Sequence, residues 1–245
     1  MPSRLLPDRR HRTELVCHRG ANALAPENTY PAAQHCIDWQ ADWLEIDVNT
    51  SLDGVMYVFH GPGLERTTDG TGTLHDLTSH EVDRLDCGAW FTPRFAGERV
   101  PRLAEFLQWA KGRIKLFLDV KRAPLEDLVR LIDDTGLRDE SFFWFGDATM
   151  ARRFRAIDPG LTLKINVNSV AGIDHAVRAY GAAIVEFGLA EDTADLIDVC
   201  RTAGVSSMIR YGGDSTRAFE SILSLAPDMA NVDHPDRFLA LRDRP

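Results

Sequence analysis

Short apolar runs alternate with helix-length amphipathic stretches along almost the whole chain. Apolar runs bounded by turn residues predict strands, and apolar positions at helical spacing predict helices. We expect strands at residues 15–17, 43–48, 55–59, 115–120, 142–145, 161–167, 183–187, 207–210 and 229–232. We expect helices between most of them, at residues 31–40, 103–110, 124–135, 148–157, 173–180, 194–203 and 216–225. Strands that alternate with helices in this way predict parallel βαβ units.

The short connection after residue 48 identifies one strand that breaks this rule. Residues 49–54 are too few for a parallel crossover, which needs about a dozen residues. Asp53-Gly54 is also a favoured hairpin turn, so residues 55–59 are expected to return antiparallel on the strand before them. The other eight strands predict an α/β fold, a (β/α)8 TIM barrel with a β-hairpin extension. The 245 residues of the chain match the ~250 that are typical of such barrels.

The chain shows no sign of a second domain. No linker rich in Ser, Pro or Gly divides it, so residues 1–245 are expected to form a single barrel domain. Residues 61–99 break the alternation, with many Gly, Thr and Asp and a short helical patch near residues 79–85, and they predict a small insertion over the C-terminal mouth. Its aromatic residues Trp90, Phe91 and Phe95 would form either a lid or a contact with a second subunit, which leaves a homo-oligomer open.

Charge and composition exclude several partners. The chain has 28 Lys and Arg against 37 Asp and Glu, a net charge of −9, and its basic residues form no long stripe, which argues against nucleic acid. No run approaches the ~18 apolar residues of a spanning helix, so no integral membrane segment is expected. The N-terminus lacks the apolar region of a signal peptide, and the cysteines lack metal-finger spacing. Buried thiols and a cytoplasmic location are the expectation.

Polar residues lie where the predicted strands end, which is where barrels of this type build their sites. They are His18 and Arg19 after the first strand, Glu45 and Asp47 in the second, His60 after the returning strand, and Asp119 and Lys121 at the next. Glu45 and Asp47 are two residues apart, so both side chains point to the same face. Inside a barrel they would repel unless a cation lay between them, and Asp119 would be a third ligand of a hard divalent ion. The alternative is an outward-facing pair that is solvated or bound to Lys and Arg.

The remaining polar residues suit a phosphate-containing small molecule. Histidines at positions 18 and 60 could move protons at the two ends of a phosphodiester. Arg19 and Lys121 would neutralise its non-bridging oxygens. Lys164 and Arg210 lie in or at the end of apolar strands, where a cation is unexpected. Each would either face the barrel mouth and bind an anion, or extend to solvent.

Together these motifs resemble the glycerophosphodiester phosphodiesterase family. The resemblance rests on His18-Arg19-Gly20, Pro26-Glu27-Asn28-Thr29, Glu45-x-Asp47, Asp53-Gly54, His60 and Asp119-Val120-Lys121, and more faintly on Asn231-Val232-Asp233-His234-Pro235. It implies a barrel enzyme that cleaves glycerophosphodiesters to glycerol 3-phosphate and an alcohol. It also implies that a neighbouring glycerol hydroxyl attacks first and that water then opens a cyclic phosphate.

The resemblance further implies a role for each site residue. Ca²⁺ or Mg²⁺ would lie on Glu45, Asp47 and Asp119. The acid–base pair would be His18 and His60, and Arg19 and Lys121 would hold the phosphate. Glu27 would lie near the metal, and Asn28 and Thr29 would start the first helix.

Three positions depart from the pattern of the family. Gly61 follows the second histidine in place of Asp, and Asp119 stands where Glu is usual. Arg210 and Tyr211 occupy a region where relatives often have Trp. These departures leave alternatives open: a different small diester, of the sugar-phosphate (opine) or lysophospholipid type, or a catalytically silent barrel that binds a phosphorylated ligand.

Overall fold

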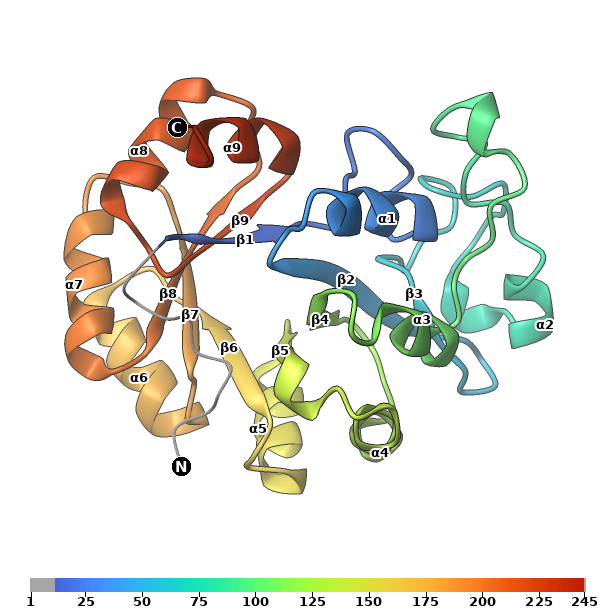
Figure 1. The fold of residues 1–245 in the computed structure, drawn as a ribbon. Helices are drawn as coiled ribbons and strands as arrows, with labels where there is room; N and C mark the ends of the chain where they lie inside the picture. Colours follow the sequence, from blue (N-terminus) through green and yellow to red (C-terminus); the bar gives the residue numbers. More distant parts are fainter. Residues whose placement is uncertain (1–11, 245) are drawn as a thin grey trace.

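The computed structural model describes residues 12–244, and within them eight parallel strands close into a barrel (Figure 1). The barrel is closed because β1 pairs in parallel with both β2 and β9. The barrel strands are β1 (Glu14–Cys17), β2 (Trp43–Thr50), β4 (Lys115–Val120), β5 (Ser141–Phe145), β6 (Thr162–Asn166), β7 (Ile184–Gly188), β8 (Ser206–Tyr211) and β9 (Met229–Val232). The predicted (β/α)8 fold is confirmed.

Helices cover the outside of the barrel between the strands (Figure 1). They are α1 (Tyr30–Asp38), α3 (Leu103–Ala110), α4 (Leu125–Thr135), α5 (Ala148–Ile157), α6 (Val170–Tyr180), α7 (Thr193–Ala203) and α8 (Thr216–Leu225). A further helix, α9 (Pro235–Arg242), was not predicted. Its pattern is weak because only Pro235 and Phe238 of its residues are buried.

The strand β3 (Met56–Val58) lies outside the closed barrel, as predicted. It runs antiparallel to β2, and Val58 and Met56 are opposite Val48 and Thr50. The hairpin places His60, which follows β3, at the same end of the barrel as the C-terminal half of β2.

The interior of the barrel has an apolar floor and a polar upper part. Every second residue of a strand points inward, and a buried apolar cluster in the lower interior is made by Val16, Trp43, Phe117, Phe142, Ile184, Met208 and Met229. The rings of Phe117 and Phe142 are stacked with centroids 4.5 Å apart. Two residues further along β2 and β4, the inward positions are Glu45 and Asp119 instead. The apolar floor therefore supports a set of charged residues near the C-terminal ends of the strands.

Residues 61–99 pack on the hairpin around a small apolar cluster that they share with Tyr57 and Phe59, beside β3 and α3 in Figure 1. The segment contains the helix α2 (Ser79–Val82) and the 3₁₀ turns η1 (Leu74–Asp76) and η2 (Pro93–Phe95). Arg66 reaches from it to Glu27 in the loop after β1, at 2.6 Å. Trp90 is 41% exposed and its ring lies 5.6 Å from that of Phe91. A role of Trp90, Phe91 and Phe95 as a lid or subunit contact stays a prediction.

Among residues 12–244, no helix has the length and apolar character needed to span a membrane. The four cysteines are buried, as expected.

Candidate active site

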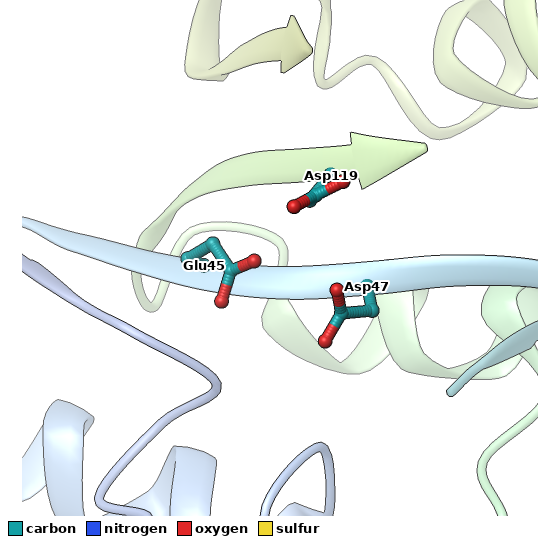
Figure 2. A group of neighbouring side chains, drawn as sticks. All are labelled: Glu45, Asp47 and Asp119. Carbon is teal, nitrogen blue, oxygen red and sulfur yellow. The ribbon is translucent and has the colours of Figure 1, made fainter. Parts of the chain in front are cut away.

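Three carboxylates meet inside the C-terminal end of the barrel (Figure 2). Glu45 and Asp47 project from the inner face of β2 and are fully buried, and Asp119 stands beside Asp47 in register on β4. One oxygen of each lies within 4.8 Å of one oxygen of the others. Within the described part of the chain, Glu45 Oε1 and Asp119 Oδ1 are buried without a hydrogen-bond partner. Three carboxylates that offer oxygen ligands, some of them without a hydrogen-bond partner, form a set of ligands that fits Mg²⁺ or Ca²⁺.

The pKa shifts of these acids show that the neighbouring cations offset the cost of burial for Asp47 but not for Glu45 and Asp119. Burial, together with the charges of Asp47 and Asp119, raises the pKa of Glu45 well above its usual range. Burial and Asp47 likewise raise the pKa of Asp119 to about 6. For Asp47 burial acts in the same direction, but Lys121 and Arg19 outweigh it, so its pKa is lowered. A divalent cation would stabilise the ionised form of all three carboxylates.

The loop after β1 holds the acids in place. The backbone N–H of Arg19 donates to Glu45 Oε2 at 2.6 Å. Asn28 forms a two-point contact with Asp47: its Nδ2 donates to Asp47 Oδ2 at 2.7 Å, and its Oδ1 accepts from the Asp47 backbone N–H at 3.0 Å. Asn28 adopts φ +60°, outside the helix, and Thr29 alone caps α1. The expectation that Asn28 starts the helix is therefore wrong.

The predicted phosphate-binding cations lie beside these acids. Lys121 Nζ is 2.6 Å from Asp119 Oδ2 and 3.1 Å from Asp47 Oδ1. Arg19 lies 3.2 Å from both Asp47 and Glu27. Glu27 also accepts a forked contact from Arg66, at 2.6 and 2.7 Å, so its charge is neutralised from two sides. Both cations remain partly exposed, Lys121 by 24% and Arg19 by 18%, and could contact an anion in the mouth.

His18 follows β1 and is held by residues of the adjacent part of the barrel wall, Asp233 after β9 and Arg210 near the end of β8. Its Nδ1 contacts Asp233 Oδ1, and Arg210 Nη2 lies 2.9 Å from the same nitrogen. Burial lowers the pKa of His18; Asp233 opposes this shift, and the positive charge of Arg210 adds to it. Asp233 was not among the predicted site residues, although it directly follows β9 and satisfies the strand-end rule.

His60 approaches the same region from the hairpin. Its backbone carbonyl accepts a hydrogen bond from Asn49 Nδ2 at 3.3 Å. Its side chain lines a small cavity together with Glu27 and Asn28. Burial lowers the pKa of His60 against the opposing charge of Asp47. An imidazole kept neutral near pH 7 can accept a proton.

The two further predicted cations occupy different positions. Lys164 is buried below the mouth, 2% exposed, where it pairs with Glu186 and lies 4.9 Å from the Phe117 ring centroid. The alternative prediction, that Lys164 extends to solvent, is therefore wrong. Arg210 is 29% exposed at the mouth, but its charge is matched by Asp233 at 3.0 Å. Glu186 was missed, although a carboxylate inside the apolar strand β7 is as unexpected as the cations at Lys164 and Arg210.

The chain is similar to known proteins in both its sequence and its fold. Residues 18–127 match the model of the glycerophosphoryl diester phosphodiesterase family. The crystal structure of a glycerophosphodiester phosphodiesterase from Agrobacterium tumefaciens is 34% identical, covers 93% of this chain and 99% of its own, and superposes with a TM-score of 0.88. This chain belongs to the glycerophosphoryl diester phosphodiesterase family. A phosphodiesterase of Oleispira antarctica, solved in complex with the product sn-glycerol-3-phosphate, has the same fold at 21% identity, with a TM-score of 0.83 over 95% of this chain and 98% of its own.

Curated members of the family match over shorter stretches. The glycerophosphodiester phosphodiesterase of Caldanaerobacter subterraneus is 39% identical over 97 residues, 40% of either chain. That of Bacillus subtilis is 33% identical over 114 residues, 43% of this chain and 39% of its own. Across the first three curated relatives, the matched part spans 39–58% of their length.

Proposed function

We propose that this protein hydrolyses a glycerophosphodiester to glycerol 3-phosphate and an alcohol, with a divalent cation on Glu45, Asp47 and Asp119. The observation that carries the proposal is the meeting of these three carboxylates within 4.8 Å beside the two partly exposed cations Arg19 and Lys121. The family membership and the relatives named as glycerophosphodiester phosphodiesterases support it. Such a cation, when bound, supplies positive charge that polarises the phosphoryl group.

The residues of the chain have separate tasks in this proposal. The side chains of Arg19 and Lys121 bind the non-bridging oxygens and orient the phosphorus for attack. One histidine of the pair His18 and His60 takes the proton from the attacking glycerol hydroxyl. As the P–O bond to the alcohol breaks, the other histidine, which enters the reaction protonated, gives its proton to the leaving oxygen and becomes neutral.

The second half of the reaction reverses these roles. A cyclic phosphate remains after the alcohol has left, and one histidine removes a proton from water as the water oxygen attacks phosphorus. The ring P–O bond then breaks, and the other histidine protonates the released glycerol oxygen. Both imidazoles return to their starting state, so that no net proton is taken from the protein.

Turnover of defined diesters tests the proposal. Purified protein is incubated with glycerophosphocholine and with a generic aryl phosphodiester, each with and without EDTA, and glycerol 3-phosphate and free phenol are measured. Turnover of glycerophosphocholine that stops with EDTA and returns with Mg²⁺ or Ca²⁺ is the expected result. Turnover of the aryl diester alone would indicate a different natural diester, and no turnover of either would leave a barrel that only binds phosphate.

A further inference from the structure

Arg210 makes contacts that differ from those of an anion-binding residue. It lies near the end of β8, and its guanidinium lies against three groups that belong to or follow the next two strands, β9 and β1. Nη2 is 3.0 Å from Asp233 Oδ1 and 2.9 Å from His18 Nδ1, while Nη1 is 3.5 Å from the backbone carbonyl of Asn231. Its contacts are thus made to the residues around one imidazole nitrogen.

Asp233 is enclosed as well as bound. Its Oδ1 is shared by the His18 ring, Arg210 and Asn22 Nδ2, the last at 3.5 Å. On its other side the backbone approaches so closely that a Cβ at Gly212 would be 2.9 Å from Asp233 Oδ2 and 3.6 Å from both terminal nitrogens of Arg210. Arg210 and the close backbone of Gly212 therefore both oppose rotation of the carboxylate away from the imidazole.

We infer that Arg210 is a positioning residue for His18, which clamps the Asp233 carboxylate against Nδ1 so that the ring presents Nε2 to the substrate. A ring nitrogen that donates to a carboxylate keeps its proton, so the lone pair of the neutral imidazole is at the other nitrogen. The guanidinium donates to the same carboxylate oxygen and keeps it ionised. The inference rests on the proposed function, because it concerns an imidazole that the proposal uses.

The charges around the imidazole give the expected effect of losing Arg210. The ionisable groups that face His18 are Asp233 after β9, Arg210 from β8 and Arg19 after β1. Burial lowers the pKa of His18, Arg210 and Arg19 lower it further, and Asp233 raises it. Removal of the Arg210 charge should therefore raise the pKa of His18 while Asp233 keeps its contact with the ring, and it takes away one of the groups that hold Asp233 there.

Arg210→Gln and Arg210→Lys separate these effects. Arg210→Gln removes both the positive charge and the planar guanidinium with its paired N–H donors. Arg210→Lys keeps the charge but lacks this pair of donors. A matched control is Arg237→Gln, which removes an exposed arginine that pairs with Asp214 at 2.8 Å on another part of the surface. Asp233→Asn serves as a second variant, because it keeps an acceptor oxygen and tests the same contact if Arg210→Gln fails to fold.

The closing measurement is ¹⁵N NMR of the His18 ring over a pH titration of the Mg²⁺-loaded protein without substrate, together with kcat and KM. We expect the proton of neutral His18 at Nδ1 in the parent protein. In Arg210→Gln the pKa of His18 should rise, both tautomers should appear, and kcat should fall about 10- to 100-fold at nearly constant KM. Arg210→Lys should return the pKa towards that of the parent and recover part of kcat, and Arg237→Gln should change neither.

Two results would overturn the inference. One is a parent ring protonated at Nε2, and the other is a tautomer and pKa that Arg210→Gln and Asp233→Asn leave unchanged. An Arg210→Gln protein with a raised KM and an unaltered ring would instead assign Arg210 to anion binding. Because the ring is observed without substrate, a protein that turned over no diester would refute the proposed function and still test this contact.

Discussion

Asn49 and Gly61 lie against each other beside His60: a Cβ at residue 61 would be 2.9 Å from Asn49 Nδ2. The same Nδ2 donates to the carbonyl of His60 at 3.3 Å. The added atom would also lie 3.0 Å from two ring carbons of Phe59, and Gly61 has φ +46°. Any side chain at residue 61 must therefore displace Asn49 or Phe59, and with them the backbone of the histidine.

Gly61→Asp, which restores the residue usual in the family, is consequently expected to damage this protein. Overpacking of this kind costs about 1–3 kcal/mol, and the displaced histidine should lower kcat. The control is Gly54→Asp, at φ +86° with nothing within 4 Å of its Cβ, which carries only the backbone strain. Urea unfolding and turnover check both variants. Equal losses of stability and turnover in the two variants would show that Asn49 and Phe59 move aside at no cost, and would contradict this prediction.

Cation binding should stabilise the fold as well as support turnover. The carboxylates of Glu45, Asp47 and Asp119 repel one another in the metal-free protein, and a bound cation removes this repulsion. An ion that binds only the folded state raises the free energy of unfolding. The gain is about 2.7 kcal/mol when the free ion is at 100 times its Kd. Thermal unfolding with EDTA and with millimolar Mg²⁺ or Ca²⁺ measures it, and Tm should rise with the ion.

A variant that removes one ligand provides the matched comparison for the cation. Asp119→Asn keeps the size of the side chain and removes one negative charge, so the ion-dependent rise in Tm should shrink. Asp139→Asn, outside the barrel in the 3₁₀ turn η3 (Arg138–Glu140), should leave the rise unchanged. An undiminished rise in Asp119→Asn would place the ion elsewhere.

Loss of either site histidine should lower turnover without unfolding the protein. We expect His18→Ala and His60→Ala each to reduce kcat by about 10²–10⁴, the usual contribution of one acid or base. His175→Ala, on the exposed side of α6, is the control and should be neutral. Circular dichroism verifies the fold and a glycerophosphocholine assay measures kcat. A His60→Ala enzyme with most of its activity would remove His60 from the acid–base pair.

Most of the barrel was predictable from the chain because its signals are local. Apolar strands and amphipathic helices alternate, and the stretch between β2 and β3 is so short that it allows only a hairpin. The acids were predictable for the same reason: Glu45 and Asp47 share a face at a separation of two residues, and Asp119 lies near the end of the next barrel strand. Helix α9 was not predicted, since it buries too few apolar residues to show a periodic pattern.

The parts of the site that were missed depend on contacts between distant segments or on backbone conformation. Asn28 binds Asp47 because it adopts φ +60°, which a capping motif does not reveal. Asp233 meets His18 across 215 positions of sequence, and only closure of the barrel by β1 and β9 brings them together. The partner of Lys164 could not be predicted, because it depends on the register between β6 and β7.

The buried pair of Lys164 and Glu186 gives a test that is independent of catalysis. Lys164 is 2% exposed and Glu186 6%, and Asn231 Nδ2 donates to the second oxygen of Glu186 at 3.1 Å. Lys164→Met leaves the carboxylate buried without its cation, which should destabilise the protein by about 3–5 kcal/mol. Glu186→Gln leaves the ammonium group of Lys164 buried without its carboxylate and should lower the stability by a similar amount.

The double variant Lys164→Met/Glu186→Gln removes both charges, and the amide oxygen introduced at position 186 can still accept the hydrogen bond of Asn231. We expect its stability to lie much closer to that of the parent than either single variant does, because a matched loss leaves no uncompensated charge. Urea unfolding of the four proteins completes the cycle. If the two single losses simply add in the double variant, the ammonium and carboxylate groups do not interact, and Lys164 must be regarded as a free cation beneath the mouth.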